Sequence, residues 1–412
     1  MYLRCSNSAC AATLDLNDRT LTCPRCGDLL ELSYELDFPD PEQLKRTWRQ
    51  RRLSNDILDR SGVWRFREFL PQLYRPEMVV TMQEGNVPLL SGSRSASYAG
   101  LNALWFKHLG WNPTGSFKDT GMTVGITQAR HAGARRVACA STGNTAASMS
   151  AYAARAGISA RVYLPQGAIS LAKLAQSLDC GAEIVEVEGN FDAALDLLLQ
   201  RSDPEMYFLN SVNPFRIEGQ KTVIFELMEQ LSWHPPDYIV LPGGNLGNTA
   251  AFGKALQELK SAALIEKVPR LVVVQAEGAN PFVRLWDSQA ETLEPIENPS
   301  TAASAICIGS PRSWKKALRA VKFTGGTCLD VSESEIAQAK ALIGSDGIGC
   351  EPASATTLAG IRKLVSTGRL DPDAAVVALL TGHVLKDPDY IIRSCGKLAI
   401  AKKAKESIIA RH

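Results

Sequence analysis

The sequence predicts an α/β protein built from two open, mainly parallel sheets with helices on both faces, preceded by a small zinc ribbon. From about residue 100 onward, short apolar runs rich in β-branched residues alternate with helical stretches rich in alanine and leucine. The runs are apolar throughout, as expected of strands buried on both faces. Four of the ten cysteines lie in the first 26 residues. A length of 412 residues favours two substantial domains plus an appendage.

The ribbon is predicted from two cysteine pairs, Cys5 with Cys10 and Cys23 with Cys26. Between them the alternating stretch "TLDLNDRTLTC" predicts a hairpin, and two such pairs offer four thiolates to a tetrahedral zinc ion. The second pair, in "CPRCG", is tightly spaced, whereas four residues separate the first two cysteines. The alternative is a ribbon without metal. If zinc binds, we expect its loss to unfold the leader and largely spare the rest of the chain.

A basic run, "KRTWRQRR", follows a proline-marked linker and contains Trp48. Such a run could indicate a nucleic-acid-binding protein built on an inactive enzyme scaffold. Acidic residues flank it closely, and 45 basic against 43 acidic residues give a formal net charge of only +2. A solvated helix face is therefore favoured, and we expect no nucleic-acid partner.

Seven runs are predicted strands, and the loops that follow them are the candidate site, because open parallel sheets bind ligands beyond the carboxyl ends of their strands. The runs are "RRVACAS", "ARVYLP", "AEIVEVEG", "YFLN", "DYIVLP", "RLVVVQAEG" and "AAVVALLT".

Two of these loops open directly into helices and suit anions. "STGNTAAS", residues 141–148, offers the unpaired N–H groups and partial positive charge of a helix start to a carboxylate. The alternative is an ordinary N-cap made by Ser141 or Thr142. "GGNLGN", residues 243–248, has three glycines that let the main chain wrap a phosphate. An ordinary glycine turn is the alternative there, and the glycine spacing is not that of a dinucleotide site.

Three further segments complete the candidate site. Asn210, Ser211 and Arg216 lie close together around "SVNPFRIEGQK" and predict a second anion site. Thr381 places one hydroxyl at the end of a strand. In "NPTGSFKD", Lys118 lies just inside a predicted helix start. A lone lysine is usually a surface residue, but a lysine beside a carboxylate loop, a phosphate loop and a hydroxyl has the parts needed to hold pyridoxal phosphate as a Schiff base.

Five segments, "NPTGSFKD", "STGNTAAS", "NSVNPFRIEGQK", "PGGNLGN" and "TGHVLKDPD", resemble in this order the threonine synthases of the type-II pyridoxal-phosphate fold. The resemblance covers nearly the whole chain and includes the zinc-ribbon leader. It implies pyridoxal phosphate as cofactor, structural zinc, and conversion of O-phospho-L-homoserine and water to L-threonine and phosphate by γ-elimination and β-addition. The implied domains are a leader over 1–37, a large cofactor domain over 38–111 and 208–412, and a smaller substrate-clamping domain over 112–207.

The resemblance also assigns roles to residues. Lys118 would carry the Schiff base and move protons. Asn144 would bind the cofactor's 3-hydroxyl and Thr381 its pyridine nitrogen. The cofactor phosphate would be held by Gly243, Gly244, Asn245, Leu246 and Gly247. The substrate carboxylate would be held by Thr142 and Thr145, and its phosphate by Asn210, Ser211, Arg216 and Ser141. Thr120 and Val384 depart from the family pattern and could reshape a wall of the substrate pocket.

Two related chemistries stay open as alternatives: a threonine or serine dehydratase, and a cysteate-synthase-like β-replacement on phosphoserine. A dehydratase has no use for a second phosphate site. Phosphoserine would use one, and it differs from phosphohomoserine by a single methylene, a difference in pocket length that the sequence does not reveal.

The start of the chain lacks the apolar core of a signal peptide and no apolar run is long enough to span a bilayer, so we expect a cytoplasmic protein without a membrane partner. A homodimer is an open alternative to a monomer.

Overall fold

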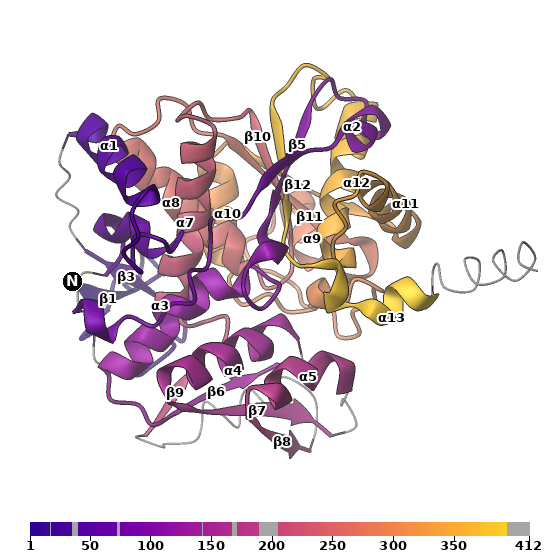
Figure 1. Cartoon of the computed structure of the whole chain (residues 1–412). Coiled ribbons are helices and arrows are strands. Elements are labelled where there is room, and N and C mark those ends of the chain that lie inside the picture. Colours follow the sequence, from indigo (N-terminus) through magenta and orange to yellow (C-terminus); the bar gives the residue numbers. More distant parts are fainter. Residues whose placement is uncertain are drawn as a thin grey trace, which may run out of the picture.

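The computed structural model describes residues 1–16, 18–34, 40–71, 75–141, 143–166, 171–188 and 205–393. Within them the chain forms three sheets, and the two larger ones lie one above the other in Figure 1. This arrangement confirms the predicted fold class of open, mainly parallel sheets with a small leader.

The larger sheet has the strand order β12-β11-β10-β13-β5-β4 and is parallel except for its edge strand β4. Its strands are β4 Leu89–Ser91, β5 Leu104–His108, β10 Tyr238–Pro242, β11 Arg270–Ala276, β12 Thr327–Val331 and β13 Val376–Leu380. Alternate strand residues point into two separate cores: Ile239 and Leu241 into one, Val240 into the other. The central strands are therefore buried on both faces, which explains their unbroken apolar sequences.

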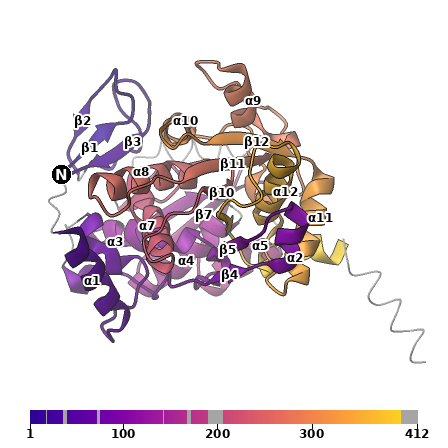
Figure 2. The ribbon, with the colours of Figure 1, turned by 90° about the horizontal axis from the view of Figure 1, so that it is seen from above.

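Helices cover each face of this sheet. One face packs against α7 Pro214–Gln230, α8 Gly247–Ser261 and α10 Trp314–Phe323. The opposite face packs against α2 Ser93–Ala99, α11 Glu333–Ser345 and α12 Pro352–Ser366. The two sets lie on opposite sides of the sheet in Figure 2.

The smaller sheet is wholly parallel, with the order β8-β7-β6-β9. Its strands are β6 Arg136–Ala140, β7 Ser159–Pro165, β8 Glu183–Val187 and β9 Met206–Phe208. Its helices are α3 Lys118–His131, α4 Asn144–Ala156 and α5 Leu171–Asp179. Apolar side chains of α3 and α4 share one core with β6 and β7, so the helix that begins at Lys118 is packed against this sheet.

All seven predicted strands are present, but three strands of the larger sheet were missed: β4, β5 and β12. The strand β5 contains Lys107 and His108, which read as polar in the sequence and are nevertheless fully buried. Lys107 forms an ion pair with Glu226 of α7, and this pairing makes burial of its charge tolerable.

The leader forms the third sheet, in the order β2-β1-β3. Its strands are β1 Tyr2–Cys5, β2 Thr13–Leu14 and β3 Leu30–Ser33. The hairpin predicted within residues 13–23 is wrong, because Thr13 and Leu14 pair with β1 instead. The sheet thus brings the two cysteine pairs together around β1.

The basic run lies on α1 Pro41–Arg52, where Trp48 is completely buried against Phe66, Phe69 and Phe225. The nucleic-acid interpretation requires an exposed aromatic ring on which a base can stack, and the ring of Trp48 is not available for this. The remaining elements are η1 Trp64–Phe69, η2 Pro76–Met78, η3 Leu109–Trp111, η4 Glu277–Ala279, α9 Pro281–Ser288, η5 Ser304–Ile306, η6 Val384–Lys386 and α13 Pro388–Ile391. Among the described helices, none combines the length and apolar character needed to cross a membrane.

The helices α3 and α7 cross at very close range. A Cβ placed on Gly219 of α7 would lie 2.0 Å from the carbonyl oxygen of Thr120 on α3, so only glycine fits there. Thr120 is itself 2% exposed, and its hydroxyl donates to the carbonyl oxygen of Phe117. Thr120 therefore belongs to a helix crossing, which fixes the start of α3 relative to α7, and its expected effect on a pocket wall stays a prediction.

Candidate active site

The loop before Lys118 is tied to the end of β13 by main-chain hydrogen bonds. The amide of Phe117 donates to the carbonyl oxygen of Thr381 at 3.0 Å, and the amide of His383 donates to that of Gly115 at 2.9 Å. Lys118 follows as the first residue of α3. The segments "NPTGSFKD" and "TGHVLKDP", which are far apart in the sequence, are therefore joined, and Lys118 stands beside the strand end that carries Thr381.

The electrostatic environment of Lys118 favours its neutral amine. Burial and the positive charge of Arg216 lower the pKa of Lys118 from the ordinary 10.5 to about 7, although Glu351 acts in the opposite direction. Its ammonium nitrogen also lies 4.2 Å from the centre of the Phe117 ring. An amine with this pKa is substantially unprotonated at neutral pH and can attack an aldehyde or accept a proton.

This shift predicts how Lys118 reacts in the cofactor-free protein. The reactive form is the neutral amine, so labelling of Lys118 by fluorodinitrobenzene should rise with pH around a midpoint near 7. The check is the mass of the labelled peptide containing residue 118 as a function of pH, with the amine of a short free peptide as reference. A midpoint close to that of an ordinary lysine would contradict the assigned environment.

The sequence reading missed Glu351, a buried carboxylate at the centre of the site. Its two oxygens accept hydrogen bonds from Asn144 Nδ2 and from the Thr381 hydroxyl, each at 2.9 Å. Burial raises the pKa of Glu351, whereas Asn144 and Thr381 act to lower it. A Cβ on Gly382 would lie 2.3 Å from the carboxyl carbon of Glu351, so the glycine after Thr381 makes room for this group.

A weak signal for Glu351 was present in the sequence. It precedes Pro352 at the start of α12, where serine, threonine, aspartate or asparagine would be the usual N-cap. A glutamate there that makes no side-chain cap has its carboxylate available for another partner.

The loop after β6 has the geometry of an anion-binding helix start. The helix α4 begins at Asn144, and no side chain caps it. The Ser141 hydroxyl accepts from the amide of Gly143 at 3.2 Å, so it closes a local turn and leaves the helix uncapped. Thr145, in the first turn, is half-buried, and Thr142 lies outside the described residues. The uncapped N–H groups of this turn are suited to a carboxylate.

The glycine-rich loop after β10 has the same property. Leu246, at the N-cap of α8, adopts a left-handed conformation with φ of 63°, and again no side chain caps the helix. The first helical hydrogen bond runs from Ala250 to the carbonyl oxygen of Leu246. Gly243 packs against β11, where a Cβ would lie 2.7 Å from Val273 Cγ1. In the first turn the hydroxyl of Thr249 is buried without a partner. Asn245 and Gly244 lie in the same loop, which can therefore hold a phosphate with main-chain amides and one hydroxyl.

Arg216 is a buried cation with two unpartnered nitrogen atoms. It is 1% exposed, and its Nη1 donates to the carbonyl oxygen of Leu209 at 3.1 Å. Both Nε and Nη2 are buried without a hydrogen-bond partner. Burial lowers the pKa of Arg216 to about 10, which leaves the guanidinium charged at neutral pH. A buried cation without a carboxylate is costly, so this group is suited to an anion that enters from outside.

Two other residues of the predicted second anion site lie nearby in the loop after β9. Asn210 Oδ1 accepts from the amide of Ala140 at 3.1 Å, which joins this loop to the one that begins with Ser141. Ser211 follows at a half-buried position. The structure therefore brings together the two loops that the sequence predicted to hold the substrate.

The four predicted zinc ligands converge in the leader. The Sγ atoms of Cys5, Cys10, Cys23 and Cys26 all lie within 4.8 Å of one another. Cys5 and Cys26 are 3.4 Å apart, and Cys10 and Cys23 are 3.8 Å apart. Zn–S bonds of about 2.3 Å in a tetrahedron place sulfur atoms roughly 3.8 Å apart. The cluster therefore fits a four-thiolate zinc ion, and the wider spacing of the first pair does not prevent convergence.

The assembled groups also fit pyridoxal phosphate. Lys118 offers an amine with a lowered pKa, the loop 243–248 offers a phosphate cradle, and Asn144 and Thr381 present polar side chains beside them. Each of these groups was expected from the sequence. Their individual roles toward the cofactor and substrate remain predictions.

Comparison with known proteins agrees with this chemistry. Residues 80–382 match the family described as pyridoxal-phosphate dependent enzymes. The chain is 42% identical over 396 residues to the threonine synthase of Methanocaldococcus jannaschii, covering 96% of this chain and 95% of that protein. It is 44% identical over 398 residues to the threonine synthase of Methanosarcina acetivorans, covering 96% and 94%.

Among solved structures, threonine synthase from Escherichia coli aligns with a TM-score of 0.72 over 96% of this chain and 91% of that one, at 18% identity. At 18% identity that likeness supports the fold alone, whereas the two relatives at 42% and 44% identity show the family. The chain therefore belongs to the pyridoxal-phosphate dependent enzymes and, within them, to the threonine synthase family.

Proposed function

We propose that this protein converts O-phospho-L-homoserine and water to L-threonine and inorganic phosphate. The observation that carries the proposal is Arg216, a buried guanidinium with two unpartnered nitrogens. Its positive charge helps to lower the pKa of Lys118. A cofactor phosphate is already provided for by the loop 243–248. A second anion site near the reactive amine is required only if the substrate itself carries a phosphate.

In this proposal the chain binds the substrate at two ends. The uncapped start of α4, with Thr142 and Thr145, holds the α-carboxylate, and Arg216 with Asn210, Ser211 and Ser141 holds the phosphate. Pyridoxal phosphate, when bound, supplies an electron-withdrawing ring that stabilises negative charge at the carbons next to the substrate amine. Asn144 and Thr381 orient this ring, and the neutral Thr381 hydroxyl tempers its electron withdrawal, which suits elimination and replacement.

Lys118 performs the proton transfers. Its Nζ, with a pKa of about 7, can accept the α-proton at neutral pH and later return a proton. Arg216 stabilises the charge that develops on phosphate as the bond from the γ-carbon to oxygen breaks. Water then adds at the β-carbon. Glu351 holds Asn144 and Thr381 in one arrangement and partly offsets the positive charge of Arg216 at Lys118.

A comparison of substrates tests the proposal. The purified protein should release phosphate and form threonine from O-phospho-L-homoserine, and should act poorly on O-phosphoserine, serine and threonine. Phosphate release and amino-acid analysis from the same reaction measure both products. Preferred turnover of unphosphorylated serine or threonine would favour a dehydratase, and preferred turnover of phosphoserine would favour β-replacement.

The setting of the reaction is part of the proposal. A cytoplasmic location would keep the four ribbon thiols reduced and available to zinc. We also propose the division into a leader over 1–37, a large domain over 38–111 and 208–412, and a clamping domain over 112–207. A homodimer is compatible with this division, and light scattering of the purified protein distinguishes it from a monomer.

A further inference from the structure

The ribbon is joined to the helix that carries Arg216. Phe215, the residue before Arg216, is 2% exposed and belongs to one apolar cluster with Leu3, Cys5, Cys23 and Leu30. An aromatic side chain of α7 thus lies among apolar residues and cysteines of the ribbon. In Figures 1 and 2 the ribbon sheet lies beside α8, close to α7.

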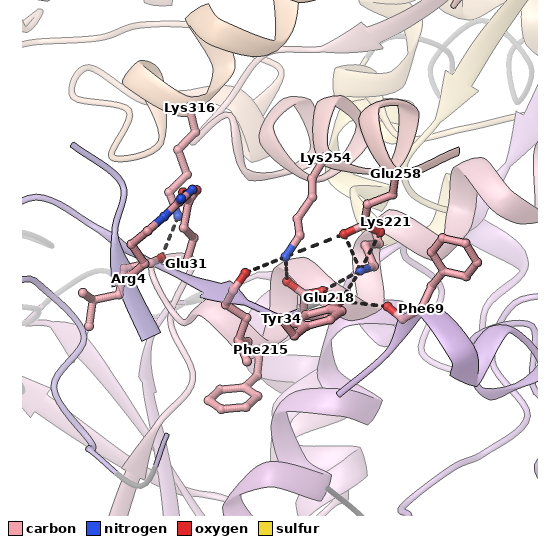
Figure 3. A network of polar contacts seen from close by, with 12 residues as sticks. Arg4, Glu31, Tyr34, Phe69, Phe215, Glu218, Lys221, Lys254, Glu258 and Lys316 are labelled. Carbon is pink, nitrogen blue, oxygen red and sulfur yellow. Dashed lines mark hydrogen bonds and ion pairs between the residues drawn. The ribbon is translucent and has the colours of Figure 1, made fainter. Parts of the chain in front are cut away.

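A charge cluster, formed by Tyr34, Glu218, Lys221, Lys254 and Glu258, extends this contact (Figure 3). Tyr34, the residue that follows β3, donates its hydroxyl hydrogen bond to Glu218 at 2.5 Å, and the same hydroxyl accepts from Lys221 at 2.5 Å. Lys254 of α8 forms an ion pair with Glu218 and donates to the carbonyl oxygen of Leu32 in the ribbon at 3.0 Å. Lys221 Nζ also forms an ion pair with Glu258 Oε2 at 2.8 Å. The ribbon therefore supplies two of the polar groups that satisfy this cluster.

The cluster is charged and well buried. The side chains of Lys221 and Glu218 are 0% and 1% exposed. Burial acts to raise the pKa of Glu218, but Lys221 and Lys254 bring it down to about 2. A buried set of charges contributes little net stability, yet it strongly disfavours any arrangement in which one partner is missing. Such a cluster therefore fixes the position of α7 more than it strengthens the fold.

The opposite side of α7 faces the site. Arg216 and Gln220 are four residues apart and share one face of the helix, whereas Phe215 and Glu218 share another. A Cβ on Gly247, in the phosphate loop, would lie 3.6 Å from Gln220 Oε1. The first two turns of α7 thus contact the ribbon on one face and present Arg216 and Gln220 on the other.

We propose that the ribbon is a positioning element of the second anion site: by completing the charge cluster on α7 it fixes the direction of Arg216. This inference rests on the proposed function of Arg216. It replaces the expectation that loss of zinc would largely spare the catalytic part of the chain, since the ribbon shares a core with Phe215 and supplies partners to buried charges.

Tyr34→Phe tests the inference in the full-length, cofactor-loaded protein. The substitution keeps the ring and removes the hydroxyl that Glu218 and Lys221 share. The matched control is Lys315→Gln, which removes an exposed ribbon-to-α10 ion pair with Asp28 and does not touch α7. The probe is inorganic phosphate, with its dissociation constant measured by calorimetry.

We expect Tyr34→Phe to weaken phosphate binding by at most about tenfold, because it removes hydrogen bonds of the charge cluster and affects phosphate only through the position of Arg216. We also expect it to raise KM for O-phospho-L-homoserine more than it changes kcat. Cofactor content and the visible spectrum should match the wild type, and Lys315→Gln should match it in every measurement. Equal phosphate binding by Tyr34→Phe and Lys315→Gln would overturn the inference. So would an equal loss of cofactor and phosphate binding, which would make the ribbon a general stabiliser.

Zinc removal provides a second measurement should Tyr34→Phe fail to fold. Treatment of the wild-type protein with a chelator under reducing conditions should weaken phosphate binding while cofactor absorbance persists, and added zinc should restore it. Unchanged phosphate binding by zinc-free protein would overturn the inference. If wild-type protein does not turn over O-phospho-L-homoserine at all, the proposed function fails, whatever these variants do.

Discussion

Replacing Lys118 with alanine is expected to abolish threonine formation, with a loss of at least about 10⁴-fold in kcat, because the substitution removes both the attachment point of the cofactor and the base that moves protons. Lys118 is the first residue of α3, and its pKa is lowered to about 7. Other described lysines near the site are engaged elsewhere. Lys386, for example, forms a hydrogen bond with Gln176 on the smaller sheet's α5.

Borohydride reduction followed by peptide mass analysis measures the attachment directly. In the wild type the reduced cofactor should appear on the peptide containing Lys118, and in Lys118→Ala on no single peptide. A small external amine such as methylamine should restore part of the proton transfer to the variant. Lys260→Ala removes an exposed lysine on α8 and serves as the control that should keep wild-type activity. Near-normal threonine formation by Lys118→Ala would refute the central assignment.

The central strands and their loops were predictable because their sequences carry two consistent signals. β10 and β13 are apolar throughout, and each is followed by residues that a helix start or a tight turn requires. Lys118, the loop 141–148 and the loop 243–248 were therefore found from local sequence alone. Their convergence also depends on how the two sheets face each other, because loop 141–148 follows a strand of the smaller sheet and loop 243–248 a strand of the larger one. Glu351 links the two sheets through Asn144 and Thr381.

What the sequence did not reveal depends on partners that are distant in the chain. Lys107 is polar but occupies a buried strand position, and its partner Glu226 lies 119 residues away. Glu351 accepts hydrogen bonds from Asn144, which is 207 residues away, and from Thr381. No local pattern predicts such pairs, because burial of a charge becomes acceptable only once the fold supplies the opposite group.

Arg216 and Arg65 show how a structural arginine differs from a binding one. Both are 1% exposed. Arg65 is paired with Glu229 at 2.8 Å and with Asn86 at 2.5 Å. Arg216 has no carboxylate partner, and two of its three nitrogens are unsatisfied. A buried cation without an opposite charge destabilises the folded chain, so we propose that an anion binds Arg216 and supplies this charge.

Arg216→Met is therefore expected to lose activity without losing stability. Methionine can keep the packing of the side-chain stem against Gly125, while the phosphate loses a charge-assisted donor both on binding and during departure. We expect kcat/KM for O-phospho-L-homoserine to fall roughly 30- to 1000-fold. This fall corresponds to a loss of about 2 to 4 kcal/mol of transition-state stabilisation. The cofactor should stay bound, because the loop 243–248 and Lys118 are unchanged.

The matched variant Arg65→Met should behave in the opposite way. It leaves Glu229 without its buried partner, so the unfolding temperature should fall while recognition of phosphate is preserved in the protein that remains folded.

A further measurement distinguishes a binding role for Arg216 from a general loss of structure in the variant. Because the charge of Arg216 depresses the pKa of Lys118, the labelling midpoint of Lys118 should move upward in Arg216→Met and stay near 7 in Arg65→Met. Unchanged turnover of O-phospho-L-homoserine by Arg216→Met would remove the second anion site from the mechanism, and a dehydratase would then be the better description of the enzyme.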